Sequence, residues 1–462
     1  MKKHLIFLSL LLIFTVAVSS LAVFSLDSKK EAVTITEQKF KGDKSLVDGL
    51  TVTSAITLDD HLLWEIDYTL GNDPRLNADF GFSLSELEYY NNHRQISASV
   101  DLNIPAGCNT TTNEPQKGLA AVYRSLYDSL SNGGEASKRV KLSDYYEYYP
   151  LAFEFHMPGI QWQGRRAQGY TGEDSYADVQ DTLSEYFKIP VMGSTTLTVS
   201  VSRNSSGSSL GFGMSYDGDM YSANTASAHT ASTCYFTVSP FTTSGKSVDL
   251  SQIRGGYGIY AIDYSTPTSN ADTGIDADSI RNVFALDPKT QVTEMMVTKD
   301  SSSLVALAKE EGSLALYVIR LDNMSLAEKF TFENQSGAYL YQGDGFIMLY
   351  FGNNLALVDM RDPKNPTLAI NTPLEHLDTM YDLYHTRDLT QAVFDGETLV
   401  MCDFLKDRYG YDRASFYVAA YTAYGLGFYA KYECSLDLNR SSAQSSNPSP
   451  LGEGALKIVR RQ

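Results

Sequence analysis

The chain has 462 residues, a formal net charge of −18 and a pI near 4.8. This acidity argues against nucleic acid as a partner, because binding to phosphates requires a cationic surface. The four cysteines, Cys108, Cys234, Cys402 and Cys434, show no CxxC spacing, which argues against zinc-ribbon and thioredoxin-like sites. Four cysteines in so long a chain do not form a disulfide scaffold, and we expect small buried thiols. The alternative is a disulfide, for which Cys402 and Cys434 are the nearest pair in sequence.

The N-terminus predicts export. A short basic start, Met1 to His4, precedes an apolar run from Leu5 to Leu26 that is broken only by Ser and Thr. About 20 apolar residues in a helix span the roughly 30 Å hydrocarbon core of a bilayer, which favours a single-pass membrane anchor with an extracytoplasmic body. The alternative is a signal peptide cleaved after Ala22, which releases a secreted protein.

Alternating apolar and polar residues predict strands with one buried face. Leu62–Leu70 alternates in this way and places Trp64 inward, and Ile96–Ile104 shows the same pattern. Leu197–Val201 and Leu210–Tyr216 flank a polar turn, which predicts a hairpin.

Helical periodicity interrupts these strands. Apolar residues from Leu119 to Leu130 recur at helical spacing, and Gly133-Gly134 follows as a stop signal. This pattern predicts an inserted helix near residues 117–131, packed on a sheet. Weaker helical patterns occur at Asp181–Phe187 and Leu374–Tyr384.

The C-terminal half contains a weak internal repeat of about 40 residues. Leu304–Ala308 aligns with Phe346–Tyr350, and Leu314–Ile319 aligns with Leu355–Met360. Leu399–Phe404 continues the series. Each unit has a buried strand, a polar turn, a second strand and a turn rich in Asp and Pro, which is typical of four-stranded sheets stacked beside their neighbours.

Two segments resemble the outer hairpins of β-propeller repeat families, including the pyrroloquinoline-quinone-type and LVIVD-type repeats. They are Val283-Phe-Ala-Leu-Asp-Pro-Lys-Thr and Leu355-Ala-Leu-Val-Asp-Met-Arg-Asp-Pro-Lys-Asn-Pro, and Tyr257-Gly-Ile-Tyr-Ala-Ile-Asp-Tyr-Ser-Thr-Pro is similar to them. The resemblance covers roughly residues 255–436 and implies architecture only. The Trp-docking residues of the quinone-type repeat are absent, so quinone binding is not implied.

We therefore predict an all-β fold, a β-propeller-like array of four-stranded sheets over residues 45–436. A transmembrane helix or signal peptide (1–26) and a linker (27–44) precede the array, and a disordered tail (437–462) follows it. Residues 45–250 either complete the same propeller or form a separate β-domain. A closed ring removes exposed strand edges, which favours one propeller.

Three aspartates mark a candidate calcium site. Asp272, Asp276 and Asp278 lie in a polar loop, Asn270 to Ser279, and offer the oxygen ligands that Ca²⁺ prefers. The residues after Asp276 depart from the EF-hand pattern, so a solvated loop is the alternative. No other cofactor is expected, and Asp217-Gly218-Asp219 is interpreted as a turn.

A cluster of tyrosines is a candidate glycan contact. Tyr145, Tyr146, Tyr148 and Tyr149 form the densest group among the 31 tyrosines of the chain. Aromatic rings combine an apolar face with polar edges, which suits stacking on sugar rings. The alternative is that these tyrosines fill half-exposed strand positions, which their propensity also favours.

Trp162, close to Arg165 and Arg166, is a candidate contact for a partner. Trp and Arg are frequent among the residues that dominate the energy of interfaces. The alternative is a core Trp beside a surface Arg pair.

Catalytic motifs are absent from the sequence, since it contains no Gly-x-Ser-x-Gly elbow, HExxH helix or P-loop. We therefore expect a non-enzymatic extracytoplasmic binding, scaffold or sensor protein of the cell envelope, tethered to the membrane. Its expected partner is an envelope protein, peptide or glycan. The alternative is an envelope glycan hydrolase or lyase, because the fold alone does not decide function.

Overall fold

The structure is a computed structural model of the chain. It describes residues 2–30, 33–58, 62–82, 95–100, 102, 119–156, 162–163, 166–167, 173–206, 210–264, 274–335, 337–375, 391–407, 410–435 and 456–460.

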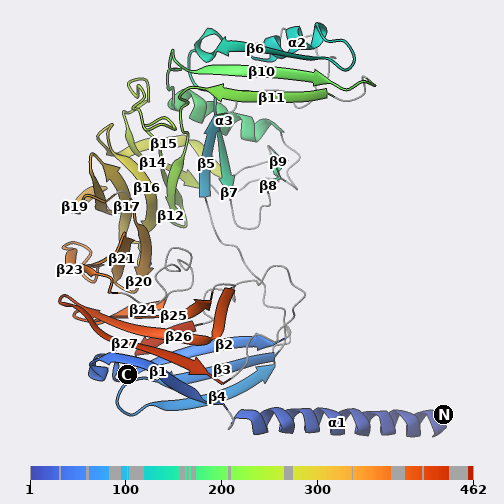
Figure 1. Cartoon of the computed structure of the whole chain (residues 1–462), viewed down its shortest axis with the longest axis vertical. Helices are drawn as coiled ribbons and strands as arrows, with labels where there is room; N and C mark the ends of the chain where they lie inside the picture. The colour runs from blue at the N-terminus through green and yellow to red at the C-terminus, as the bar shows by residue number, and fades with distance from the viewer. Residues whose placement is uncertain are drawn as a thin grey trace. The chain divides into compact units, whose positions relative to one another are not determined.

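Most of the described residues belong to β-strands, which form several four-stranded antiparallel sheets (Figure 1). The predicted all-β, propeller-like array of such sheets is confirmed. The chain divides into two compact units. Unit 1 comprises Met1–Tyr90 and Ala338–Gln462, and unit 2 comprises Asn91–Gly337.

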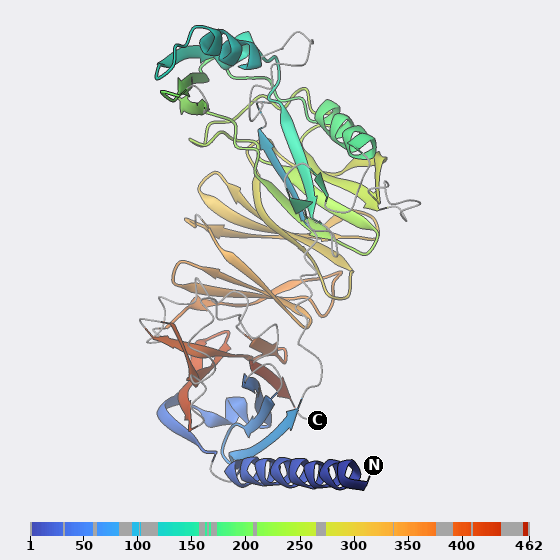
Figure 2. The same ribbon diagram turned by 90° about the vertical axis from the view of Figure 1, so that its right-hand side faces the viewer.

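Unit 2 contains two meandering four-stranded sheets. The first is formed by β12 (Thr225–His229), β13 (Thr233–Val238), β14 (Gly258–Tyr264) and β15 (Ile275–Ala285). The second is formed by β16 (Gln291–Val297), β17 (Ser303–Glu310), β18 (Ser313–Arg320) and β19 (Ser325–Glu333). The two sheets pack against each other (Figure 2), and buried side chains that include Ala261, Ala306 and Tyr317 fill the space between them.

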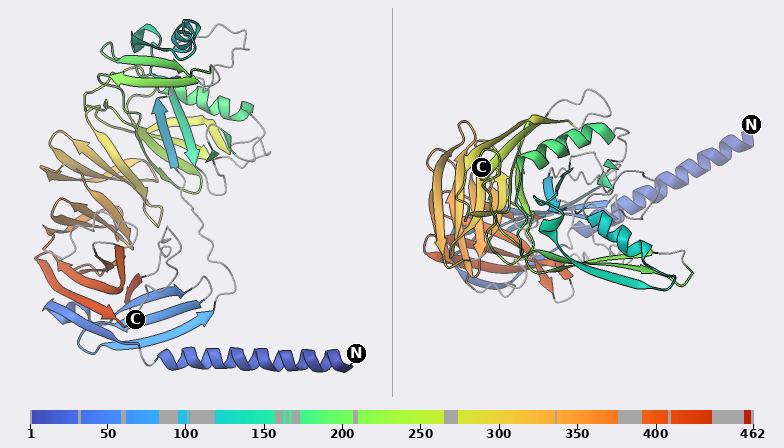
Figure 3. Two further views of the ribbon diagram at one scale, coloured as in Figure 1. Left: turned by 45° about the vertical axis from the view of Figure 1, so that its right-hand side comes forward. Right: turned by 90° about the horizontal axis from the view of Figure 1, so that it is seen from above.

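The remainder of unit 2 contains the helices. β5 (Gln95–Val100) pairs with β7 (Leu151–His156), and β11 (Leu210–Asp217), β10 (Thr196–Arg203) and β6 (Glu135–Lys141) form a three-stranded sheet. Helix α2 (Leu119–Asp128) lies against one face of this sheet (Figure 3), and helix α3 (Glu173–Tyr186) contacts β7 and β15. The predicted inserted helix and the β10–β11 hairpin are confirmed.

Unit 1 contains three sheets. β20 (Tyr339–Gly343), β21 (Phe346–Phe351), β22 (Asn354–Asp359) and β23 (Thr367–Pro373) form a meander. β24 (Gln391–Phe394), β25 (Leu399–Asp407), β26 (Gly410–Thr422) and β27 (Gly425–Cys434) form a second meander, which β1 (Ile35–Gly42) extends. The third sheet has the order β28 (Leu456–Arg460), β2 (Leu50–Leu58), β3 (Leu62–Thr69), β4 (Arg75–Phe82), and the 3-10 turn η1 (Lys44–Val47) precedes β2.

The sequence repeat corresponds to the inner strands of the sheets. β17, β21 and β25 are second strands, and β18 and β22 are third strands. Inner strands are covered on both faces. This explains why their sequences are continuous apolar runs and do not alternate between apolar and polar residues. One repeat-like segment differs from the prediction. Val283–Ala285 ends β15 and Leu286–Thr290 leads to β16 of the next sheet, so the segment does not form a hairpin within a sheet.

Three predicted boundaries need correction. Residues 27–44, predicted as a linker, contain β1, which pairs with β27. The tail predicted at 437–462 ends in β28, which pairs with β2 and buries Ile458. Both are edge strands whose Lys, Arg and Glu residues obscure the apolar pattern. β12 and β13, which precede residue 250, share a sheet with β14 and β15, so the predicted boundary at 250 does not separate sheets.

Helix α1 (Lys2–Lys30) precedes the sheets of unit 1. Its described apolar side chains are largely exposed, including Leu12 (66 %), Leu21 (69 %) and Phe24 (73 %). At its C-terminal end, Lys30 Nζ lies 2.6 Å from Asp79 Oδ1 of β4. Within the part of the chain that the structure describes, no helix has the combination of length and apolarity that a membrane crossing requires.

The described cysteines are buried thiols. Cys234 and Cys402 are completely buried and Cys434 is nearly so. Burial raises the pKa of Cys234 to about 12, so this thiol stays protonated. Cys108 and most of the helical pattern at Leu374–Tyr384 lie outside the described residues.

Candidate functional site

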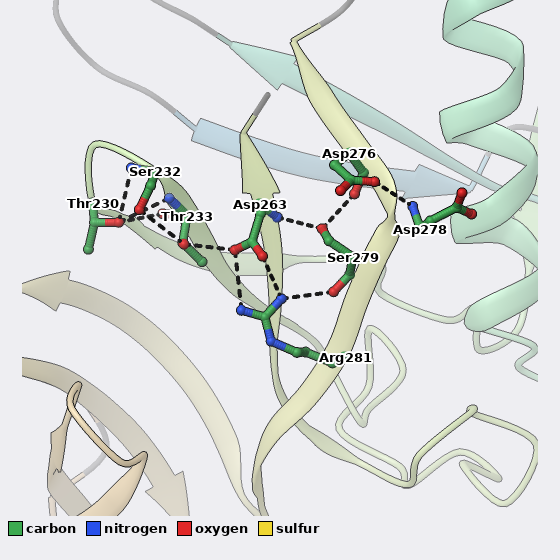
Figure 4. Close-up of polar contacts among 8 residues, drawn as sticks. All are labelled: Thr230, Ser232, Thr233, Asp263, Asp276, Asp278, Ser279 and Arg281. Carbon is green, nitrogen blue, oxygen red and sulfur yellow. Dashed lines mark hydrogen bonds and ion pairs between the residues drawn. The ribbon is translucent and has the colours of Figure 1, made fainter. Parts of the chain in front are cut away.

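Two of the aspartates predicted to bind Ca²⁺ lie in a bulge of β15 (Figure 4). β14 and β15 pair at Asp263↔Asp276 and again at Ala261↔Arg281, so more residues of β15 than of β14 lie between these pairs. The side chains of Asp276 and Asp278 are exposed there. Bulges redirect side chains and are frequent beside functional sites, which makes this bulge a candidate.

Hydrogen bonds within the bulge hold its backbone. Asp278 N donates to Asp276 Oδ1 at 3.2 Å, and Ser279 Oγ donates to the carbonyl oxygen of Asp276 at 2.6 Å. Asp263 N in turn donates to Ser279 Oγ at 2.7 Å. Ser279 therefore joins the two strands where their regular pairing is interrupted.

Asp263 forms a structural ion pair across the same two strands (Figure 4). Arg281 Nη1 donates to Asp263 Oδ2 at 2.8 Å and Arg281 Nη2 to Oδ1 at 3.2 Å, while Thr233 Oγ1 donates to Oδ1 at 2.8 Å. The hydrogen bonds from Arg281 lower the pKa of the Asp263 carboxyl below its usual value. The ionised carboxylate is thus already occupied by protein groups.

The described residues include no group of three or more His, Cys, Asp or Glu side chains placed to hold a metal ion. Asp272, the third predicted ligand, lies outside the described residues. Calcium binding by Asp272, Asp276 and Asp278 therefore stays a prediction.

The tyrosine cluster lies against the core of unit 2. Tyr149 is 2 % exposed, and its hydroxyl lies 3.1 Å from Thr195 Oγ1. Tyr146 is half-buried, and its hydroxyl donates to the carbonyl oxygen of Leu102 at 2.9 Å. Tyr145 and Tyr148 are half-buried as well. Glycan contact by these four residues stays a prediction, and two of the four hydroxyls are engaged in holding the fold.

The predicted partner contact falls on a small strand pair. Trp162 lies on β8 (Trp162–Gln163) and Arg166 on β9 (Arg166–Ala167), where Gln163 pairs with Arg166. Arg165 lies outside the described residues, and the side chains of Trp162 and Arg166 are not among those described. A role in partner binding therefore stays a prediction.

An open depression in unit 1 was not anticipated from the sequence. Its volume is about 670 Å³, and it lies at the end of the β3–β4 hairpin. Leu70 and Leu76 supply apolar surface. The polar side chains that line it are Asp48, Asp67, Thr69, Asn72, Asp73, Arg75 and Asn77.

Two cross-strand pairs form the floor of the depression. Asp67 pairs with Asn77, and Thr69 pairs with Arg75, in the antiparallel register of β3 and β4. Paired residues project from the same face of a sheet, so these four side chains lie together, on the face opposite buried Tyr68. A rigid hairpin therefore positions a row of hydrogen-bonding groups.

The turn at the rim is held by a carboxylate. Asn72 N donates to Asp48 Oδ1 at 2.8 Å, and Asn72 Nδ2 donates to Asp48 Oδ2 at 3.1 Å. Gly71 has φ +101°, and a Cβ at this position would overlap Asp48 Oδ1, so a larger residue does not fit. Arg75 Nη2 lies 2.6 Å from Asp73 Oδ2.

A buried hydroxyl lies beside this floor. Thr51 of β2 is completely buried and pairs with Thr69, which places both side chains on the same face of the sheet. Among the described residues, Thr51 Oγ1 has no hydrogen-bond partner. Buried hydroxyls normally find a partner, so this oxygen is an unsatisfied polar group in the sheet behind the hairpin.

Asp219 follows the predicted turn at Gly218 and is a structural carboxylate. Its side chain is 5 % exposed and lies 3.4 Å from Lys246 Nζ. Ser244 N donates to Oδ1 at 3.1 Å, and Ser244 Oγ donates to Oδ2. The hydrogen bond from the Ser244 hydroxyl holds the pKa of Asp219 well below its usual range. The carboxylate thus fixes the 242–246 loop.

Replacing Asp219 by Asn is expected to lower the Tm of the protein at neutral pH. A carboxyl whose pKa is lowered in the folded state stabilises it above its unfolded pKa, about 3.9, and this stabilisation is lost as the pH falls further. The Tm difference between wild type and D219N should therefore shrink below about pH 4. Calorimetry across pH checks this, with exposed Asp322→Asn as the control; an equal difference at every pH would contradict it.

No protein-family model matches the chain, and no curated protein matches it. Among solved structures, a protein assigned as a 6-phosphogluconolactonase from Bacteroides fragilis is 9% identical, with 83% of this chain and 82% of that chain covered and a TM-score of 0.26. The β-propeller domain of Cps50 (Swd1) from Myceliophteria thermophila is 11% identical, with coverages of 54% and 93% and a TM-score of 0.21.

An oligogalacturonate lyase in complex with manganese is 10% identical, with 52% of this chain covered and a TM-score of 0.24. The chain spans 54% of the length of that lyase. At such identities and TM-scores, the likeness carries no argument about activity or metal. The fold class, all-β and propeller-like, therefore follows from the sheets of this chain.

Proposed function

We propose that this chain is an exported binding protein of the cell envelope, and that the depression of unit 1 takes a polyhydroxylated ligand such as an envelope glycan. The observation that carries the proposal is the row of polar side chains on the β3–β4 hairpin, next to a volume of about 670 Å³. Small-molecule sites commonly have volumes of about 300–1,000 Å³.

The chemistry of the lining suits sugar hydroxyls. Asp67 offers only acceptors, Arg75 offers only donors, and Asn77 and Thr69 offer both. A sugar hydroxyl donates one hydrogen bond and accepts others, so it matches such a mixed surface. Hydrogen bonds to charged groups are roughly twice as strong as neutral ones, which makes Asp67 and Arg75 the strongest contacts.

Export supports the choice of ligand, because an exported protein meets the glycans of the envelope. The basic start and apolar run before Leu26 are the basis for this part of the proposal. Anchoring through the apolar run Leu5–Leu26 would retain the protein in the membrane fraction, whereas cleavage after Ala22 would release it into the medium. Cell fractionation distinguishes the two, and a cytoplasmic protein would contradict export.

The alternative is a glycan hydrolase or lyase acting at the same depression. Three carboxylates, those of Asp48, Asp67 and Asp73, line it. Glycoside cleavage commonly uses two carboxylates about 5–10 Å apart on either side of the scissile bond. Incubation of oligosaccharides with the protein, followed by analysis of the products, distinguishes binding from cleavage.

Replacing Asp67 by Asn together with Asn77 by Ala is expected to weaken glycan binding about 10- to 100-fold. A hydrogen bond to a charged group contributes about 1.5–3 kcal/mol, and each 1.4 kcal/mol changes Kd about tenfold. Calorimetric titration of the full chain with chitooligosaccharides, oligoglucosides and muropeptides measures the change.

Asp344→Asn is the matched control, because Asp344 is an exposed aspartate of unit 1 outside the depression. It should leave Kd unchanged. A wild-type protein that binds none of these oligosaccharides, or a double variant with wild-type Kd, would contradict the proposed site.

A further inference from the structure

The strand β11 presents an open sheet edge in unit 2. β11 is the outermost strand of the β6–β10–β11 sheet, and its outer side pairs with no strand among the described residues (Figure 1). The exposed residues of β11 include Gly211, Ser215 and Tyr216, the last of which is 39 % exposed. Its backbone donors and acceptors on that side are therefore available to another chain.

Other long edge strands are protected by charge. Among the described edge strands of at least eight residues, β1 carries Lys39, β4 carries Arg75, β15 carries Arg281 and β19 carries Lys329. β11, with the sequence LGFGMSYD, contains no Lys, Arg or Pro. Such residues are the usual means by which an edge is kept from pairing with another chain.

The opposite edge of the same sheet makes the contrast direct. β6 has the sequence EASKRVK, in which Lys138, Arg139 and Lys141 are exposed. Asp217 is the charged residue of β11, and its side chain contacts residues of the other two strands of the sheet. Thr198 Oγ1 donates to Asp217 Oδ2 at 2.7 Å, and Arg139 Nε lies 3.4 Å from the same oxygen. One edge of this small sheet thus carries three exposed cations, and the other carries none.

We propose that β11 pairs antiparallel with β11 of a second copy of this chain, which joins two three-stranded sheets into one of six strands. A pairing centred on Gly213 sets Gly211 of one copy opposite Ser215 of the other. This register keeps Met214 and Tyr216, which pair with buried Val199 and Leu197, on the apolar face that α2 covers. It brings no like charges together.

A second copy of the same strand suits this edge. In a two-fold pairing, every residue of the edge lies opposite a residue of the same strand. On the face of the sheet opposite α2, β11 carries glycines and small polar residues. Tyr123 OH of α2 donates to the carbonyl oxygen of Gly213 at 3.0 Å and holds the strand in place.

The test is the oligomeric state of the full chain in mild detergent, measured by analytical ultracentrifugation over a range of concentrations. Wild type should form dimers. Ser215→Lys, which sets a positive charge on the edge of each copy, should raise the dimer dissociation constant at least about tenfold. Ser137→Lys is the matched control, because Ser137 is an exposed serine on the same face of the sheet, on the opposite edge strand.

Ser137→Lys should dimerise as wild type does, and circular dichroism should show that both variants are folded. A monomeric wild type would overturn the proposal. Dimers that persist unchanged in Ser215→Lys, or that are lost equally in Ser137→Lys, would overturn it too. Because glycan titration does not depend on β11, failure here leaves the proposed ligand site untouched.

Discussion

Replacing Phe187 by Ala is expected to lower the free energy of unfolding of unit 2 by about 3–5 kcal/mol. Phe187 follows α3 and is 1 % exposed. Its ring centroid lies 4.7 Å from that of Tyr260, 5.5 Å from that of Phe153 and 5.7 Å from that of Phe236. The side chain thus joins the helical part of unit 2 to the β12–β15 sheet, and its removal leaves a cavity between them.

Chemical denaturation followed by hydrogen exchange in residues 173–264 measures this loss. Leu326→Ala is the control, because Leu326 is an apolar residue of unit 2 that is 42 % exposed on the edge strand β19. Its substitution should change stability by no more than about 0.5 kcal/mol. A loss below about 1 kcal/mol for F187A would show that the aromatic cluster is not packed as described.

Replacing Leu357 by Ala is expected to lower the free energy of unfolding of unit 1 by about 2–5 kcal/mol. Leu357 lies on the inner strand β22, is completely buried, and belongs to the core formed with Met348, Met401 and Tyr417. Leu357 also lies in the sequence repeat. The loss of stability therefore tests whether β22 is an inner strand, because inner strands are covered on both faces.

Leu368→Ala on β23 of the same sheet is the matched control, because Leu368 is 40 % exposed. Denaturation monitored by hydrogen exchange in residues 338–375 compares the two variants. Equal losses for L357A and L368A would contradict the assignment of β22 as an inner strand.

Much of the fold could be predicted because inner strands have a clear sequence signature. The repeat at Leu304–Ala308, Phe346–Tyr350 and Leu399–Phe404 follows from burial on both faces, and the β10–β11 hairpin follows from alternation around a polar turn. Helix α2 could be predicted because it is amphipathic: one face packs against the sheet and the other is exposed to solvent.

The terminal strands could not be predicted because their partners lie far away in the chain. Ile35 of β1 pairs with Cys434, and Leu50 of β2 pairs with Arg460. Strands of this kind are short and charged, and what stabilises them is a sheet edge that local sequence does not reveal. The same long-range pairing explains why the division into units does not follow chain order.

The candidate sites were harder to predict than the strands. Asp276 and Asp278 stood out because they are close in sequence, yet the neighbouring carboxylate of Asp263 is paired with Arg281. The depression depends on which residues of β3 and β4 share a face, and on Asp48 reaching across to the turn at Asn72. At this turn the sequence shows only Gly71-Asn-Asp-Pro, a combination of residues that is common in turns and does not indicate a site.

The most direct test of the ligand site in unit 1 is hydrogen–deuterium exchange of the full chain with and without a bound oligosaccharide. We expect protection to appear in residues 48–51 and 67–77, which surround the depression, and to be lost in the Asp67→Asn, Asn77→Ala variant. Protection confined to other segments, or protection that survives in this variant, would contradict the depression as the ligand site.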